Sequence, residues 1–280
     1  LSIRRQRQMC IRDRDRILAQ AIVNFTLRGK IDRARLPLHG LILLYGPPGT
    51  GKTSIARGLA SRIAESMPGS ERVLFIEVEP HALASAALGK SQRAVRDLLG
   101  VTVAEHATGG PLVVLLDEVE TLAADRSKMS LEANPIDVHR ATDAVLAQLD
   151  QLGARYPNLL FIETSNFTRA IDHAFVSRAD LVEHIDLPGV EACRKILESA
   201  VGALVEVFPA VKSVLRDAVF EQAAAACVGL DGRQIRKLVL AACALDKNTA
   251  LNPEKLTAQN LLVAAQRGRA QAAAIKEHRK

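Results

Sequence analysis

Aromatic residues, cysteines and long apolar runs are all scarce in this sequence of 280 residues. It has no Trp and only 3% aromatic residues, which argues against a stacking platform for single-stranded nucleic acid. No apolar run reaches the roughly 18 residues that a membrane-spanning helix needs, and no secretory leader is recognisable. We therefore expect a cytoplasmic protein with no membrane partner. With 48% hydrophobic residues, the chain can still bury a substantial core.

Motifs for thiol or metal chemistry are missing as well. Cys193, Cys227 and Cys243 form no C-x-x-C pair and lie in helical patterns rich in Ala and Leu, which favours burial as small hydrophobes. The seven His residues show no H-E-x-x-H or similar spacing. A metal site built from Cys or His is therefore not expected.

The net charge of +6 is concentrated at the two ends of the chain. Residues 1–16 contain six Arg against two Asp, and residues 266–280 contain five Lys or Arg against one Glu, which leaves −2 on the part between them. This distribution does not support a basic face for nucleic acid. Residues 1–16 are expected to be a non-native or disordered tail, because Met9–Arg14 back-translate to a string resembling a transposon mosaic-end adapter. A native basic helix start is the alternative.

From Leu41 onward, short apolar segments alternate with longer amphipathic ones. Helical spacing is found over 54–66, 91–99 and 136–152. Strands are predicted between them, and each is buried on both faces: 41–45, 73–78, 112–116, 159–162 and 181–185. This order predicts an α/β fold with a five-stranded parallel sheet and flanking helices.

The pattern changes at Pro188-Gly189, where strand character ends. Four helical stretches follow, near 190–207, 212–227, 231–246 and 256–275. We therefore predict an α/β domain over residues 17–188 and a small helical domain over residues 189–280.

One loop carries a strong phosphate-binding signal, because it matches G-x-x-x-x-G-K-[ST] between a predicted strand and a predicted helix. Its residues are Gly46, Pro47, Pro48, Gly49, Thr50, Gly51, Lys52 and Thr53. The glycines let backbone N–H groups converge on phosphates, and Lys52 supplies a charge for the β- and γ-phosphates. The Thr53 hydroxyl is a candidate ligand of Mg²⁺.

Polar residues follow two of the predicted strands. Asp117 and Glu118 come directly after 112–116, where Asp117 would join the Mg²⁺ shell and Glu118 would deprotonate the attacking water. Asn166 follows the next strand and could contact the γ-phosphate and the water, although an ordinary helix N-cap is an equal alternative. Arg178 and Arg233 are candidates for the γ-phosphate, and surface ion pairing is the alternative for both.

Together these residues resemble an AAA+ ATPase over about Leu36–Lys280. The resemblance is closer to the pachytene-checkpoint ATPase family, which remodels HORMA-domain proteins, in the segments 117–124, 134–138, 149–151, 164–166, 171–172, 174–180 and 229–238. The resemblance implies a P-loop NTPase of the AAA+ type, with a helical lid domain, that hydrolyses ATP with Mg²⁺ as a ring-shaped homohexamer. It makes Asn166 the sensor-1 residue, Arg178 an arginine finger that reaches the neighbouring subunit's ATP, and Arg233 the sensor-2 arginine.

The resemblance also implies a substrate pore loop, which maps to Ala86, Ala87, Leu88 and Gly89. Ala87 stands where the family usually has an aromatic residue, and it buries less area, so a limited pull is expected rather than strong threading. A second pore loop maps to about 125–134.

The function that the resemblance implies is partial unfolding of a HORMA-domain partner. The bacterial members of the family add anti-phage signalling, in which the ATPase disassembles an activated complex. The alternative is a DNA-directed clamp or helicase loader, which the charge of −2 between the ends disfavours. A nucleotide-gated module without turnover is disfavoured by the intact Lys52, Asp117 and Glu118.

Overall fold

The protein is described from a computed structural model, which covers residues 2–67, 72–78, 96–119, 135–166 and 173–277. The chain forms two compact units. The sheet unit consists of the described residues within 13–47 and 51–185, and the helical unit consists of those within 186–280 together with 2–12 and 48–50. The expectation that residues 1–16 form a non-native or disordered tail stays a prediction.

The sheet unit contains five parallel strands in the order β2-β3-β4-β1-β5, which confirms the predicted five-stranded parallel sheet. The prediction that each strand is buried on both faces is wrong for β2, an edge strand in which Leu74 and Glu77 are exposed. The strands are β1 (Leu41–Tyr45), β2 (Leu74–Val78), β3 (Leu112–Leu116), β4 (Leu159–Ser165) and β5 (Leu181–His184). β4 continues three residues beyond the predicted end at 162, because Glu163, Thr164 and Ser165 stay in the ladder with β1 although they are polar. This extension carries the strand to the candidate site.

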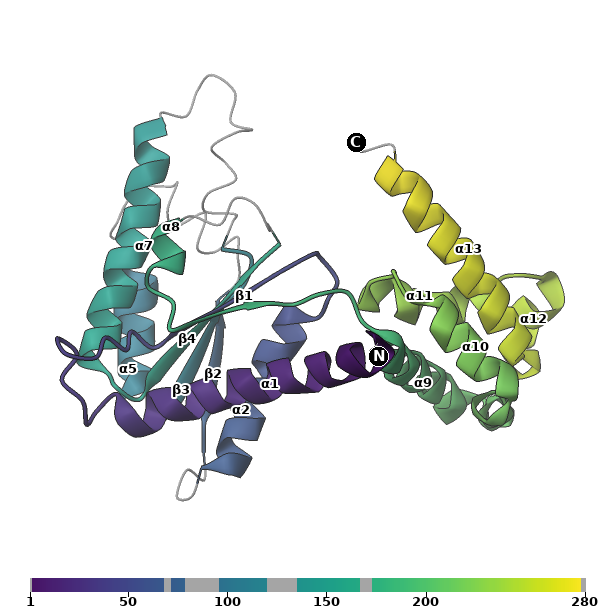
Figure 1. Ribbon diagram of the computed structural model, residues 1–280, viewed down its shortest axis with the longest axis horizontal. Helices are drawn as coiled ribbons and strands as arrows, with labels where there is room; N and C mark the ends of the chain where they lie inside the picture. Colours follow the sequence, from purple (N-terminus) through teal and green to yellow (C-terminus); the bar gives the residue numbers. More distant parts are fainter. Residues whose placement is uncertain (1, 68–71, 79–95, 120–134, 167–172, 278–280) are drawn as a thin grey trace. The chain divides into compact units, whose positions relative to one another are not determined.

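Helices cover both faces of this sheet (Figure 1). They are α1 (Ser2–Leu27), of which residues 13–27 belong to the sheet unit, α2 (Lys52–Ser66), the π-helix η1 (Arg96–Val103), α5 (Ala104–Ala107), α7 (Pro135–Arg155) and α8 (His173–Val176). The helix predicted over 91–99 continues beyond its predicted end, to Ala107, because η1 is followed directly by α5. Its predicted start, residues 91–95, lies outside the described part.

Apolar side chains alternate between the two faces along the strands. One core packs β3 residues Leu112, Val114 and Leu116 against η1, α5, α7 and α8. The opposite core packs Val113 and Leu115 against α1 and α2. Since fully burying one such side chain contributes about 1.5–3 kcal/mol, the two cores hold the central strands firmly in place.

The helical unit has its own core. Its elements are α9 (Val190–Val207), the 3₁₀-helix η2 (Pro209–Arg216), α10 (Ala218–Ala226), α11 (Gly232–Cys243), α12 (Lys247–Leu251), the 3₁₀-helix η3 (Pro253–Lys255) and α13 (Ala258–Glu277). The single helix predicted over 212–227 is wrong. Asp217 adopts an extended conformation there and its side chain accepts a hydrogen bond from the Val219 N–H, so that α10 begins anew.

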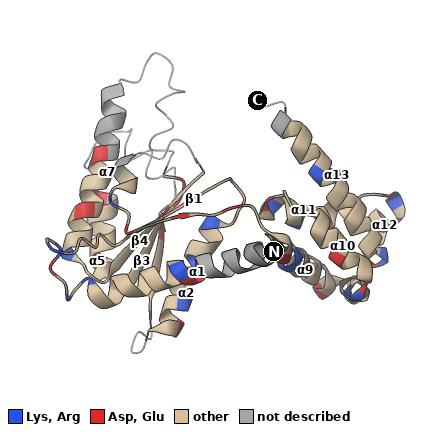
Figure 2. Ribbon diagram, viewed as in Figure 1, with Lys and Arg blue, Asp and Glu red and all other residues tan. Residues whose placement is uncertain are grey.

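Burial was predicted for Cys193, Cys227 and Cys243; the first two lie in this core, whereas Cys243 packs against it and is only partly buried. Cys193 and Cys227 are fully buried, and burial raises the pKa of the Cys227 thiol to about 12. Basic side chains are spread over the helices of both units, with acidic ones among them (Figure 2). No helix in the described ranges is long and apolar enough to cross a membrane.

Candidate functional site

The loop after β1 makes a tight turn into α2. Gly46 and Gly51 have φ angles of +149° and +96°, which L side chains rarely adopt. A Cβ atom at Gly46 would lie 2.2 Å from the carbonyl oxygen of Ile185, so this position also requires the missing side chain. Gly51 is the N-cap of α2 and makes no side-chain capping bond, which leaves the helix N-terminus suited to an anion. Pro48, Gly49 and Thr50 cluster with the helical unit.

The side chain of Lys52 lies under this loop and is buried. Its ammonium donates hydrogen bonds of 2.9 Å to the carbonyl oxygens of Gly46 and Pro47 and to Oδ1 of Asn166. The lysine therefore connects the loop after β1 with the end of β4. Because oxygen atoms already accept hydrogen bonds from the Lys52 ammonium, phosphate oxygens can replace one of these acceptors at little electrostatic cost.

Thr53 and Asp117 are in direct contact. The Thr53 hydroxyl donates to Oδ1 and Oδ2 of Asp117, at 3.0 and 3.2 Å. A hydroxyl and a carboxylate at the end of a strand are oxygen donors of the kind that Mg²⁺ takes when it keeps water and phosphate ligands as well. The two side chains predicted to serve the metal thus lie together and fit it.

Glu118 and Asn166 complete the cluster. Glu118 has a φ of +51°, the left-handed region that a non-glycine residue rarely enters. The Asn166 amide donates to Oε1 of Glu118 at 3.2 Å while its oxygen accepts from Lys52. Spacing alone left Asn166 open between a helix N-cap and a site residue, and the structure places its side chain between Lys52 and Glu118. We name Lys52, Thr53, Asp117, Glu118 and Asn166 the acid–lysine cluster.

Thr164 is a member of this site that the sequence analysis missed. It is buried on β4, and its hydroxyl contacts both Asp117 and the backbone of Glu118. A polar residue in an apolar strand, two positions before Asn166, is the only local signal that could have pointed to it.

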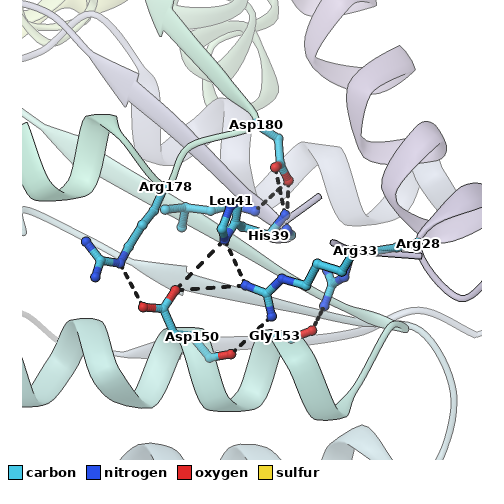
Figure 3. Close-up of polar contacts among 9 residues, drawn as sticks. Arg28, Arg33, His39, Leu41, Asp150, Gly153, Arg178 and Asp180 are labelled. Carbon is cyan, nitrogen blue, oxygen red and sulfur yellow. Dashed lines mark hydrogen bonds and ion pairs between the residues drawn. The ribbon is translucent and has the colours of Figure 1, made fainter. Parts of the chain in front are cut away.

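Arg178 lies apart from the acid–lysine cluster, next to α7. Its Nε donates to Oδ2 of Asp150 at 2.9 Å, and both side chains are half-buried. Figure 3 shows Asp150 between Arg178 on one side and Arg33 with His39 on the other; the Arg33 and His39 nitrogens lie 4.0 and 3.9 Å from Oδ1 of Asp150. Within one chain, Arg178 is therefore an ion-pair residue, which was one of its two predicted roles.

Hydrogen bonds hold the segment between α1 and β1 next to this ion pair (Figure 3). Asp180 accepts hydrogen bonds from the backbone N–H groups of His39, Gly40 and Leu41 at 2.7–3.1 Å. Arg28 donates to three carbonyl oxygens at the end of α7 and the start of β4, and burial lowers its pKa to about 10. These contacts, which the sequence does not reveal, connect the segment before β1 to Asp180 and the residues between α1 and β1 to α7 and β4.

Arg233 belongs to the helical unit, where it is exposed in the first turn of α11. Asp231 and Gln234 form a capping box at this helix start. The predicted pore loops, Ala86–Gly89 and 125–134, lie outside the described residues.

Glu163 is a buried carboxyl on β4, between Leu43 of β1 and Leu116 of β3. Its oxygens have no hydrogen-bond partner among the described residues. Burial raises the pKa of Glu163 well above its usual range, and the Arg178 charge opposes this only in part. The folded protein therefore favours the neutral acid.

The pH dependence of stability should reflect this group. Since the folded pKa is raised, its contribution to stability is full below the unfolded pKa and is lost as the pH rises toward the folded value. Glu163→Gln cannot ionise, so its melting temperature should exceed that of the wild type, and by more at pH 8 than at pH 5. Calorimetry at both pH values measures the difference.

Glu77→Gln is the control of opposite sign. Arg57 binds this carboxylate through two hydrogen bonds of 2.6 and 2.9 Å and lowers its pKa, so its contribution is present above the unfolded pKa and is lost as the pH falls. The substitution should lower the melting temperature slightly at pH 8 and less at pH 4. A Glu163→Gln difference that does not vary with pH would contradict the raised pKa.

Comparisons with known proteins agree with this geometry. The sequence model of the AAA family, the ATPase family associated with various cellular activities, matches residues 42–187. CD-NTase-associated protein 6 of Pseudomonas aeruginosa is 58% identical over 245 residues, which are 88% of this chain and 80% of that protein. A pachytene checkpoint protein 2 homologue of Oryza sativa subsp. indica is 32% identical over 90% of this chain, and one of Danio rerio is 37% identical over 63%.

The chain spans 59% and 42% of the length of these two homologues. Among solved structures, C. elegans PCH-2 has a TM-score of 0.70 at 24% identity, over 92% of this chain and 68% of that one. This last match concerns the fold.

Proposed function

Because the chain belongs to the AAA family of ATPases, in the group of the pachytene checkpoint protein 2 homologues and CD-NTase-associated protein 6, we propose that it couples ATP hydrolysis to remodelling of a HORMA-domain protein. The observation that carries the ATPase proposal is the acid–lysine cluster. It joins a phosphate-binding loop, a magnesium donor pair and a candidate base through hydrogen bonds of 2.9–3.2 Å.

In this proposal the loop and Lys52 bind the nucleotide. The Lys52 ammonium exchanges a chain oxygen for oxygens of the β- and γ-phosphates, and the start of α2 supplies N–H donors. Thr53 and Asp117, whose side chains are in contact, would hold Mg²⁺. Bound ATP with its Mg²⁺ supplies a phosphorus atom that water can attack.

Glu118 then acts as the general base. Its carboxylate accepts a proton from the attacking water, whose oxygen bonds to the γ-phosphorus as the bond to ADP breaks, giving ADP and phosphate. Asn166 orients this carboxylate through its amide, and it is released from Lys52 when phosphate oxygens take its place. A neutral amide is suited to this position because it adds no negative charge beside the phosphates.

The two arginines complete the site from outside the cluster. We assign Arg178 to the ATP of the neighbouring subunit in a homohexameric ring, as the resemblance to the family implies; within its own chain its guanidinium pairs with Asp150. Arg233, exposed at the start of α11, is assigned to the bound nucleotide as the sensor-2 arginine.

The partner proposal rests on relatives. We infer a HORMA-domain substrate and a place in anti-phage signalling, through disassembly of an activated complex, from the family to which these relatives belong. The residues proposed to engage the substrate, Ala86–Gly89, lie outside the described part of the chain. Mixed charges on the helices of both units give no separate support to the DNA-loader alternative (Figure 2).

A substrate trap tests this assignment. Glu118→Gln halts the cycle after substrate engagement, so with ATP it should retain a HORMA-domain protein encoded by a neighbouring gene. The wild type should release that protein as ATP is consumed, and Lys52→Ala should not capture it. Co-purification from a mixture of the two purified proteins measures each case.

Stimulation of the ATPase by duplex DNA, together with no capture of the HORMA-domain protein, would support the loader instead. The same mixture with ADP controls for binding that does not depend on the γ-phosphate.

A further inference from the structure

The Thr164 side chain contacts both acidic residues of the candidate site. It is 1% exposed and lies one residue before the end of β4. Its hydroxyl donates to Oδ1 of Asp117 and accepts the backbone N–H of Glu118 at 3.0 Å. The same hydroxyl group thus donates a hydrogen bond to Asp117 and accepts one from the backbone of Glu118.

The backbone of Thr164 adds a third contact to the same turn. Its carbonyl oxygen accepts the N–H of Val119 at 3.0 Å. Residues 117–119 are therefore attached to Thr164 at three consecutive positions. This matters because Glu118 holds a φ of +51°, which costs on the order of 1 kcal/mol and persists only where the surroundings enforce it.

The hydroxyl also serves Asp117 in a way that Thr53 cannot. Both hydroxyls donate to this carboxylate, but Thr53 is the candidate Mg²⁺ ligand and must turn a lone pair toward the metal. The bond from Thr164 can persist when Mg²⁺ is bound, since Thr164 is not itself a candidate Mg²⁺ ligand and its side chain is buried. Groups that orient a metal-binding carboxylate in this way typically change metal affinity by about 10–100-fold.

We propose that Thr164 is a positioning residue for ATP hydrolysis: it aims Asp117 at Mg²⁺ and holds the strained Glu118 turn in its working conformation. This inference rests on the proposed ATPase function. In this role the Thr164 hydroxyl affects both the affinity for Mg²⁺, through Asp117, and the alignment of the base Glu118.

The test compares variants with and without the hydroxyl in two size-matched pairs. Thr164→Val should raise the Mg²⁺ concentration for half-maximal turnover by about tenfold and lower kcat by about tenfold or more. Thr164→Ser should stay within about threefold of the wild type, because it keeps the hydroxyl. Binding of a fluorescent ATP analogue in EDTA should be unchanged in both. If Thr164→Val does not fold, Thr164→Ala against Thr164→Ser gives the same comparison.

Thr249→Val is the matched control for a merely structural loss. Thr249 is also buried, and its hydroxyl donates to Oδ2 of Asp246 at 2.8 Å at the start of α12. This variant should lower the melting temperature while its kcat and Mg²⁺ dependence at 25 °C stay those of the wild type. A folded Thr164→Val or Thr164→Ala enzyme with an unchanged Mg²⁺ dependence and kcat would overturn the inference.

Failure of the proposed function has a different signature. In that case the wild type and Lys52→Ala would show the same background turnover, before any Thr164 variant is examined. If the wild type hydrolyses ATP and only the Thr164 result fails, the ATPase proposal stands and the positioning role falls.

Discussion

Glu118→Gln should bind ATP as the wild type does but lose hydrolysis by about 10²–10⁴-fold, the usual range for a missing general base. A Gln side chain keeps an oxygen to accept the Asn166 amide hydrogen, so the arrangement seen at 3.2 Å can survive. It has no carboxylate to take a proton from water. Binding of a fluorescent ATP analogue and steady-state phosphate release measure the two properties separately.

Lys52→Ala is the contrasting variant. Removing the ammonium takes away a charge for the phosphates and leaves the oxygens of Gly46, Pro47 and Asn166 without their shared donor. ATP binding itself should therefore be lost, and turnover with it. Equal loss of binding in Glu118→Gln and Lys52→Ala would remove Glu118 from the role of base.

Arg178→Ala should retain ATP binding and lose turnover by about 10³-fold or more, as expected when an arginine that neutralises the transferring phosphoryl group is removed. The substitution also leaves Asp150 without its partner at 2.9 Å. Both side chains are partly exposed to water, which weakens the ion pair, so its loss should lower the stability of the protein only slightly. Phosphate release and the melting temperature are the two measurements.

Action between subunits can be separated from a local effect by mixing. Arg178→Ala protein has an intact loop, and Lys52→Ala protein has an intact Arg178. Subunit exchange between them should restore part of the activity, since some interfaces then pair the two intact residues. Asp150→Asn serves as the control for the ion pair: a 10³-fold loss in this variant as well, without rescue, would place the effect of Arg178 inside its own chain.

The strands and the phosphate loop were predictable because their signals are local. Leu41–Tyr45 and Leu112–Leu116 are continuous apolar runs, and both are strands with the predicted bounds. The glycines of the loop next to Lys52 are a local signal as well, because the turn itself requires positive φ angles at Gly46 and Gly51. The end of β4 was not predictable, because Glu163–Ser165 are polar residues, and their pairing with β1 keeps them in the strand.

By itself, the sequence determined the α/β class, the five strands and the residue types that suit phosphate and magnesium, since periodicity and spacing depend on neighbours along the chain. Only the tertiary structure decided which of these residues meet. Asn166 reaches Lys52 across 114 positions, Thr164 reaches Asp117 across 47, and Arg178 reaches Asp150 across 28. Such contacts follow from the order β2-β3-β4-β1-β5, which brings the ends of β1, β3 and β4 together. Strand order depends on how whole faces pack against helices, so no short segment encodes it.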